Sequence, residues 1–242
     1  MLISSTDNKR IKEARKLLDK KYSLEKGLFL IEGDHAVREA IKNNMLNELY
    51  LLDGNNDSYD FDYDTVSLKV MKSLSDLKST PRVIGIARIK NNNSIGKRIV
   101  ILDDVQDPGN VGTIIRNSVA FGIDTIILSK NSVSPYNNKV IRSTEGMIFN
   151  INIIISDLES SLKEIKSNGI PVIGTSLNTS NSVKNMLKSD NYAVIFGNEG
   201  NGISDKVLSY CDYVYKINMN SNCESLNVGV SCGIILYKLF EE

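Results

Sequence analysis

From residue 98 to the end of the chain, short apolar runs alternate with segments of helical periodicity. The apolar runs expected as strands cover residues 98–104, 124–129, 151–156, 170–177, 191–197 and 213–219. The segments expected as helices cover residues 111–121, 158–169, a short stretch capped by Ser204, and 225–240. This alternation is typical of parallel strands buried under helices on both faces, so we expect an α/β fold here.

Residues 1–90 carry a more mixed pattern, which predicts a smaller α/β domain. Helices are expected over 11–21, capped by Ser5 or Thr6, and over 35–44, and strands over 28–33, 49–53, 65–70 and 83–89. The polar stretch that follows has turn-forming residues and no periodicity, so we predict a linker over 91–98. The second domain then covers residues 99–242.

Composition excludes some classes of protein and leaves others open. The 29 basic and 29 acidic residues give a net charge of zero, which neither supports nor excludes nucleic acid as a partner. Three cysteines without CxxC spacing and a single histidine favour a reducing compartment and disfavour a metal site. With no signal peptide and no apolar run of membrane-spanning length, we expect a cytoplasmic protein without a membrane partner.

A polar turn follows the strand expected at 98–104. Pro108 and Gly109 set a tight turn there, and Asn110 is a suitable N-cap for the helix that begins next. Arg116 lies near the start of that helix among apolar residues. Its guanidinium is suited to bind a phosphate through two parallel hydrogen bonds, although a surface arginine lying along the helix stays an alternative.

A second polar turn, GNEGNG, follows the strand expected at 191–197. Its glycines allow a close approach of the backbone to a ligand, although a plain turn explains them equally well. Glu199 has no helix to stabilise in this interpretation and is a candidate ligand group. Because the carboxyl ends of parallel strands meet at one edge of a sheet, we expect this turn to form one composite site with the first.

A third polar turn, NSNCESLN, precedes the last helix. Ser225 or Asn222 is expected to cap that helix. Ser225, Gly229 and Gly233 recur every four residues, and glycine costs a helix about 1 kcal/mol against alanine. The pattern therefore predicts close helix packing, either within the core or in a dimer.

The helix expected near the N-terminus is rich in basic residues. Lys9, Arg10 and Arg15 are candidates for contacts with RNA phosphates. A solvated helix face is the alternative.

Taken together, the three turns resemble the motifs of a known family. DPGNVGTIIRNSVAFG, IFGNEGNGIS and INMNSNCESLNVGVS are similar to motifs 1, 2 and 3 of the SpoU (TrmH-like) RNA ribose 2′-O-methyltransferases of the SPOUT superfamily. IRSTEGM resembles the family's Arg-Ser-x-x-Gly segment and makes Arg142 a further candidate RNA contact. FLIEGDHAVREAI and TPRVIGIAR resemble the ribosomal-protein-like, RNA-binding domain often fused to these enzymes.

The resemblance implies a transfer of methyl groups from S-adenosylmethionine to a ribose 2′-hydroxyl of ribosomal or transfer RNA, without a metal. It also implies a trefoil knot in the C-terminal domain and a homodimer with sites completed across the interface. The positions that match the family's donor-binding residues are Thr175, Gly197, Ile217, Met219 and Leu226.

The positions that match the family's catalytic residues are Asn110, Arg116, Glu199, Ser225 and Asn227. Arg116 is expected to hold the target phosphate, and Asn110 to position the substrate or Arg116. Because arginine is always protonated in proteins, we expect a phosphate oxygen or a water held by Arg116 to accept the proton. Glu199, Ser225 and Asn227 are expected to orient the ribose, with Asn227 closest to the reaction. Gly229 departs from the family, which usually has serine there.

Two other interpretations remain. A noncatalytic RNA-binding or ribosome-assembly protein that retained the fold would not bind S-adenosylmethionine. A Rossmann-type enzyme is disfavoured, because the required glycine spacing after the first strand of the second domain is absent.

Overall fold

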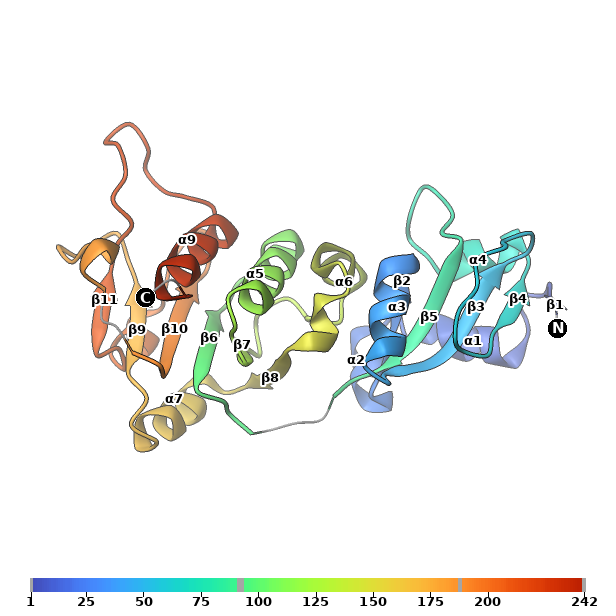
Figure 1. Cartoon of the computed structure of the whole chain (residues 1–242), viewed down its shortest axis with the longest axis horizontal. Coiled ribbons are helices and arrows are strands. Elements are labelled where there is room, and N and C mark those ends of the chain that lie inside the picture. The colour runs from blue at the N-terminus through green and yellow to red at the C-terminus, as the bar shows by residue number, and fades with distance from the viewer. Residues whose placement is uncertain (1, 91–93, 187–188, 241–242) are drawn as a thin grey trace. The chain divides into compact units, whose positions relative to one another are not determined.

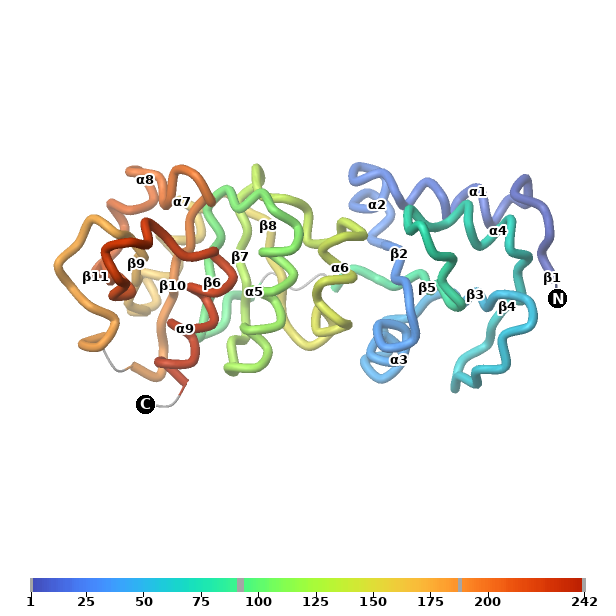
Figure 2. The backbone as a smooth tube through the Cα atoms, turned by 90° about the horizontal axis from the view of Figure 1, so that it is seen from above, coloured from blue at the N-terminus to red at the C-terminus, as the bar shows by residue number. Residues whose placement is uncertain are grey.

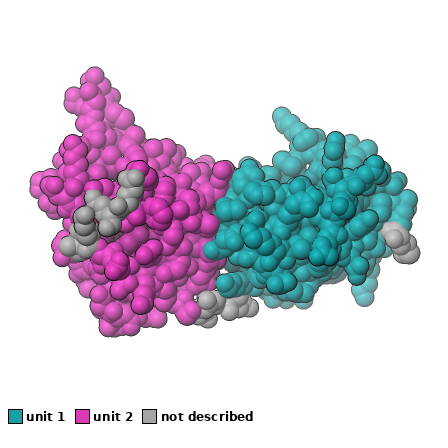
Figure 3. Space-filling model, in the orientation of Figure 1, with its two compact units in different colours: residues 1–91, 136–150 teal, residues 92–135, 151–242 magenta. Residues whose placement is uncertain are grey.

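The computed structural model describes residues 2–90, 94–186 and 189–240. The chain divides into two units, which Figure 3 shows in different colours. Unit 1 contains residues 1–91 and 136–150, and unit 2 contains residues 92–135 and 151–242. Residues 91–93 of the predicted linker lie outside the described residues.

Unit 2 is built on a parallel sheet. Its strands are β6 (Arg98–Asp103), β7 (Thr125–Ser129), β8 (Asn152–Ser156), β9 (Val172–Thr175), β10 (Tyr192–Gly197) and β11 (Tyr213–Tyr215). They lie in the order β11-β9-β10-β6-β7-β8, and every pair is parallel (Figure 1). The predicted α/β class with a parallel sheet is therefore confirmed.

Helices cover both faces of this sheet. They are α5 (Pro108–Ala120), α7 (Leu158–Ser167), α8 (Asp205–Leu208), α9 (Val228–Phe240) and the 3-10 turn η2 (Val183–Asn185). Figure 2 shows α5 and α9 side by side on one face and α7 and α8 on the other. Leu162 and Ile165 of α7 pack in a core with Ile101 and Ile195 of the strands, and all four side chains are buried.

The start of α5 differs from the prediction. The Asp107 carboxylate accepts a hydrogen bond of 2.8 Å from the Asn110 N–H, and Pro108 occupies the first helical position. Asp107 is therefore the N-cap, and the prediction that Asn110 caps the helix is wrong. Asn110 instead lies within the first turn, where it is only 8% exposed.

Unit 1 contains a mixed sheet. Its strands are β1 (Leu2–Ile3), β2 (Leu28–Glu32), β3 (Leu46–Leu52), β4 (Asp64–Val66) and β5 (Val83–Arg88), in the order β1-β4-β3-β5-β2. Its helices are α1 (Lys9–Lys16), α2 (Lys20–Lys26), α3 (Asp34–Lys42), α4 (Leu68–Ser73), α6 (Asn138–Thr144) and the 3-10 turn η1 (Met147–Asn150). Helices α1 and α4 lie on one face of the sheet, and α3 lies on the other (Figure 2).

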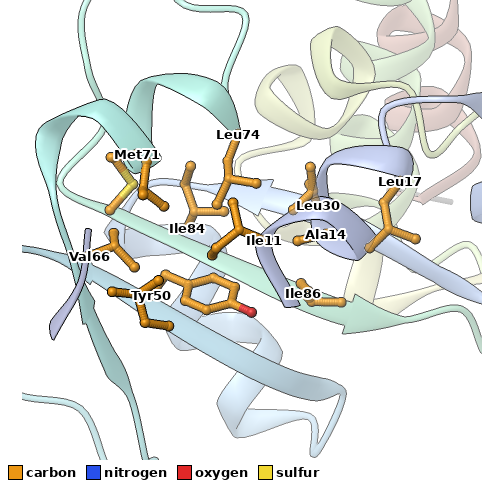
Figure 4. Close-up of a cluster of buried hydrophobic side chains, with 12 residues drawn as sticks. Ile11, Ala14, Leu17, Leu30, Tyr50, Val66, Met71, Leu74, Ile84 and Ile86 are labelled. Atoms are coloured by element: carbon orange, nitrogen blue, oxygen red, sulfur yellow. The ribbon is translucent and has the colours of Figure 1, made fainter. Parts of the chain in front are cut away.

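The core beneath α1 and α4 joins both helices to the strands. Ile11 of α1 and Met71 and Leu74 of α4 point toward Tyr50 and Ile84 of the sheet (Figure 4). None of these five side chains is exposed to solvent. Each buried aliphatic side chain contributes about 1.5–3 kcal/mol, so this contact holds the two helices firmly beside each other.

Two predicted elements of unit 1 are divided by capping residues. The helix expected over 11–21 ends at Lys16, because the Asp19 carboxylate accepts the Tyr22 N–H at 2.9 Å and starts α2. The strand expected over 65–70 ends at Val66, because the Ser67 hydroxyl accepts the Val70 N–H and starts α4. In both places a local polar cap outweighs the apolar periodicity.

Residues 136–150 belong to unit 1, although the sequence predicts them as part of the second domain. Arg142 of α6 forms ion pairs with Glu32 at 3.0 Å and with Asp76 at 2.8 Å. The Phe149 ring of η1 stacks on Phe29 of β2. These contacts join residues distant in sequence, which explains why periodicity alone could not predict them.

Candidate active site

The turn after β10 returns so closely that only glycine fits at its start. A Cβ atom on Gly197 would overlap the backbone of Gly202 and Ile203. The Asn198 side chain then fixes the turn, because its oxygen accepts the N–H groups of Gly200 and Asn201. Its amide also donates to the carbonyl of Asp104 at 2.9 Å. The second polar turn is thus bound to the end of β6.

Glu199 of this turn binds the start of α5. Its carboxylate accepts the N–H groups of Gln106 at 3.2 Å and Asp107 at 3.0 Å, and the Asn110 amide at 2.9 Å. The expectation that Glu199 has no helix to stabilise is therefore wrong. A negative charge here complements the partial positive charge at the helix N-terminus.

These contacts shift the acidity of Glu199. Partial burial opposes its ionisation, but the hydrogen bonds from Asn110 and the backbone N–H groups of Asp107 and Gln106 outweigh burial and lower the pKa of Glu199. The carboxylate therefore stays ionised, and its bonds to α5 stay intact, throughout the neutral range.

We expect Glu199→Gln to lower the free energy of unfolding by about 1 kcal/mol at neutral pH, because the new amide turns a donor toward the donors of α5. A carboxyl with a lowered folded pKa stabilises the protein above its unfolded pKa, and this contribution disappears as pH falls through the folded value. The difference between wild type and variant should therefore shrink below the ordinary pKa of 4.5. Urea unfolding at several pH values measures it, and a difference that grows in acid contradicts the assignment.

The third polar turn is joined to the first through Asn227. The Asn227 oxygen accepts the N–H groups of Gly229 at 2.9 Å and Val230 at 3.2 Å. Asn227 therefore caps α9, which begins at Val228, and the prediction of Ser225 or Asn222 as the cap is wrong.

Asn110 completes a hydrogen-bonded chain that links all three turns. Its oxygen accepts the Asn227 amide at 2.8 Å, while its own amide donates to Glu199 at 2.9 Å. The structure thus brings together three of the five predicted catalytic residues. Since the Asn110 amide group already bonds to both neighbours, its observed role is to hold the turns together.

The packing of α5 on α9 accounts for the small residues of the last helix. The Asn117 amide donates to the Gly229 carbonyl at 3.0 Å. A Cβ at Gly229 would lie 3.1 Å from the Thr113 side chain, and one at Gly233 would lie 3.1 Å from Asn117. Ser225 precedes the helix and takes no part in this packing. Asn117 was not among the predicted site residues. In the sequence, only its position directly after Arg116 pointed to it.

Arg116 and Ser225 differ from the other three predicted catalytic residues. They are exposed, as Glu199 and Asn227 are, but neither side chain forms a hydrogen bond or ion pair with any residue that the structure describes. Their polar groups are thus available to a substrate. The five predicted residues therefore divide into three that build the site and two that are open to it.

The predicted donor-binding residues lie at the ends of β9 and β10 and on the segment after β11. Thr175 ends β9 and donates through its hydroxyl to the Ile195 carbonyl at 2.9 Å. The strand expected over 213–219 ends at Tyr215, so residues 217–219 are irregular. Ile217, Met219 and Leu226 are half-buried. No described residue hydrogen-bonds to the backbone of 217–219, so these groups suit a ligand held by main-chain contacts beside apolar side chains.

The four predicted RNA contacts do not share one environment. Lys9 and Arg15 are exposed on α1, and neither has an ion-pair partner among the described residues. Arg10 instead forms ion pairs with Glu48 and Asp64. Arg142 is paired with two carboxylates of unit 1, so its charge is already neutralised. The structure thus does not support Arg10 or Arg142 as phosphate contacts.

Neither a metal-binding cluster nor a membrane-spanning helix occurs among the described residues. Over residues 2–90, 94–186 and 189–240, no His, Cys, Asp and Glu side chains are grouped so that they could hold a metal ion. In the same part of the chain, no helix has the length and apolar character needed to cross a membrane.

Comparison with known proteins decides the family. The model of the SpoU rRNA Methylase family matches residues 97–237, which include all three polar turns. The chain belongs to the SpoU rRNA methylase family. The family predicted from the motifs is thereby confirmed, and its membership makes the chain an RNA methyltransferase. The model of the MRM3-like substrate binding domain matches residues 8–85.

Relatives of this SpoU-family chain extend over nearly its full length. It is 30% identical to the 23S rRNA (guanosine(2553)-2'-O)-methyltransferase RlmP of Bacillus subtilis, over 98% of each chain. An AdoMet-bound rRNA methyltransferase from Sinorhizobium meliloti has a TM-score of 0.86 and 25% identity, over 99% of this chain and 97% of that one. A solved RNA 2'-O ribose methyltransferase has a TM-score of 0.84 and 26% identity, over 100% and 98%.

Proposed function

We propose that this SpoU-family enzyme transfers a methyl group from S-adenosylmethionine to a ribose 2′-hydroxyl of ribosomal RNA, with 23S rRNA as the first candidate. The observation that carries the proposal is the chain Glu199–Asn110–Asn227, which joins the three motif turns into one site. The near full-length similarity to a 23S rRNA 2′-O-methyltransferase supports the choice of RNA.

The methyl donor is assigned to the turns after β9, β10 and β11. The accessible backbone of residues 217–219 and the half-buried Ile217, Met219 and Leu226 support this assignment, since they offer polar main-chain groups beside an apolar surface. S-Adenosylmethionine supplies an already activated methyl group. The protein must then chiefly align the acceptor oxygen and assist the loss of its proton.

Arg116 is assigned to the acceptor side. Its guanidinium, which has no partner among the described residues, is suited to hold the phosphate beside the target ribose through two hydrogen bonds. Arginine stays protonated, so the proton acceptor is a phosphate oxygen or water that Arg116 holds. The exposed Ser225 hydroxyl is assigned to the ribose. Glu199, Asn110 and Asn227 position these groups without contacting the reacting atoms.

We further propose a homodimer that packs through α9. One side of this helix exposes large apolar side chains, which are Val230, Ile234, Tyr237 and Phe240, each at least 39% exposed. Exposed apolar surface of this kind marks an interface between proteins. Light scattering of the wild type and of Ile234→Glu tests the assignment, which requires a dimer in the first and a monomer in the second.

Two further assignments follow from the family. The trefoil knot is proposed for unit 2, and the non-sequential strand order of its sheet is compatible with it. A cytoplasmic location is proposed, and three cysteines without a disulfide suit a reducing compartment.

Calorimetric titration of the full chain with S-adenosylmethionine separates the enzyme from a noncatalytic RNA-binding protein with the same fold. The proposal requires saturable binding with one donor per chain. It also requires that Asn227→Ala, which removes the α9 cap and the bond to Asn110, weakens this binding. If the folded wild type binds no donor, the noncatalytic alternative holds.

A further inference from the structure

The surface charge of unit 1 is divided between the two faces of its sheet. Helices α1 and α4 lie beside each other on one face, joined by the core that contains Ile11 and Met71 (Figure 4). Their starts are also linked, because Ser67, which caps α4, donates its N–H to Ile3 and its hydroxyl to Ser4 just before α1. Basic residues of the two helices therefore share one surface.

The acidic residues near α1 are already paired. Lys12 binds Asp7 at 2.8 Å, and Lys16 binds Glu13 at 2.8 Å. Arg10 is likewise bound to Glu48 and Asp64 at the edge of the same face. These three cations face four carboxylates, so the paired groups leave one negative charge over beside the remaining cations of α1.

Four cations of α1 and α4 have no ion-pair partner among the described residues. Lys9 and Arg15 of α1 and Lys69 and Lys72 of α4 are exposed, and none forms an ion pair with a described residue. Lys69 of α4 and Arg15 of α1 both lie near the Asp7 carboxylate. The pKa of Asp7 is lowered first by its ion pair with Lys12 and further by the charges of Lys69 and Arg15. Two helices thus direct unpaired positive charge toward the same region.

Helix α3, on the opposite face, carries no such surplus, because its two cations are balanced by two carboxylates. On α3, Arg38 pairs with Asp34 and Lys42 lies 3.5 Å from Glu39. The segment 53–62 contains four aspartates and no lysine or arginine. Its Tyr59 hydroxyl bonds to Asp34 and its ring lies under Arg38, so this acidic segment packs on the α3 side. A polyanion would be attracted to one face and repelled from the other.

We propose that the α1–α4 face, defined by Lys9, Arg15, Lys69 and Lys72, is the surface on which unit 1 binds the phosphate backbone of its RNA substrate. The inference rests on the proposed function and adds α4, which no sequence motif indicated. Contacts to phosphates position a nucleic acid without reading its bases, so this face contributes affinity and orientation.

Salt dependence tests this surface directly. Each cation that neutralises a phosphate adds about 0.7–0.9 to the slope of log affinity against log salt concentration. The double variant Lys69→Ala/Lys72→Ala in the full chain should therefore lose nearly two units of slope and at least about tenfold in affinity at low salt. The probe is an unmodified 23S rRNA transcript, with binding measured by filter retention from about 50 to about 300 mM salt.

Lys42→Ala on α3 is the matched control, because it removes one exposed lysine from the opposite face. It should leave the slope unchanged, and donor binding should be equal in all variants. An unchanged slope and affinity in the double variant, with a wild type that binds and methylates the transcript, would overturn this inference alone. A wild type that neither binds nor methylates the transcript would overturn the proposed function as well.

Discussion

Arg116→Ala is expected to slow methyl transfer by about a hundredfold or more, the usual cost of removing one preorganised group that binds developing charge. The residue is exposed on α5 and has no partner among the described residues, so its loss leaves no buried group unsatisfied. Folding and donor binding should therefore be unaffected. Single-turnover transfer of labelled methyl groups to RNA measures the chemical step.

Arg116→Lys is the matched control for charge. Lysine keeps the positive charge but lacks the planar fork that binds a phosphate through two hydrogen bonds. It should therefore restore RNA affinity more fully than the rate of methyl transfer. If Arg116→Ala turns over at nearly the normal rate, Arg116 does not hold the target phosphate. If lysine restores the full rate, the fork geometry is not needed.

Gly197→Ala should have the second large effect. The added methyl would overlap the backbone of Gly202 and Ile203, which cannot yield without opening the turn that carries Glu199. Overpacking costs about 1–3 kcal/mol or more, which for a chain of this length lowers the melting temperature by about 3–10 °C. Because the opened turn no longer fixes Glu199 at α5, donor affinity should fall at least about tenfold.

Gly200→Ala is the control within the same turn. A Cβ there would lie 3.5 Å from the Asn198 oxygen, an ordinary contact, so stability and donor binding should stay near wild type. Thermal unfolding and calorimetry of both variants make the comparison. If Gly197→Ala and wild type bind the donor with equal affinity, the turn after β10 is not part of the donor site.

Periodicity predicted the parallel sheet of unit 2 because its strands are nearly continuous apolar runs and its helices are amphipathic. The same reasoning failed where a polar cap interrupts the pattern. Asp19 and Ser67 each start a helix inside a segment that hydrophobicity alone would continue as one element. Residues 216–219 were expected to continue the last strand, because they are apolar at alternate positions, but β11 ends at Tyr215.

The roles of the site residues could not be predicted because they depend on contacts distant in sequence. Asn110 bonds to Glu199, 89 residues away, and to Asn227, 117 residues away. Motif resemblance identified these residues but could not reveal that they bond to one another. Arg142 is a similar case, since its partners Glu32 and Asp76 lie in the first hundred residues. The sequence therefore proposed the site residues, and the tertiary contacts show which of them bond to one another.

The most direct measurement is the chemical identity of the product. Unmodified 23S rRNA is incubated with the full-length chain and labelled S-adenosylmethionine, digested to nucleosides, and analysed by mass spectrometry. We expect one 2′-O-methylated ribonucleoside in the wild-type reaction and at least about a hundredfold less with Arg116→Ala. A methyl group found on a base, or no transfer to ribosomal RNA by a folded protein that binds the donor, would contradict the proposed function.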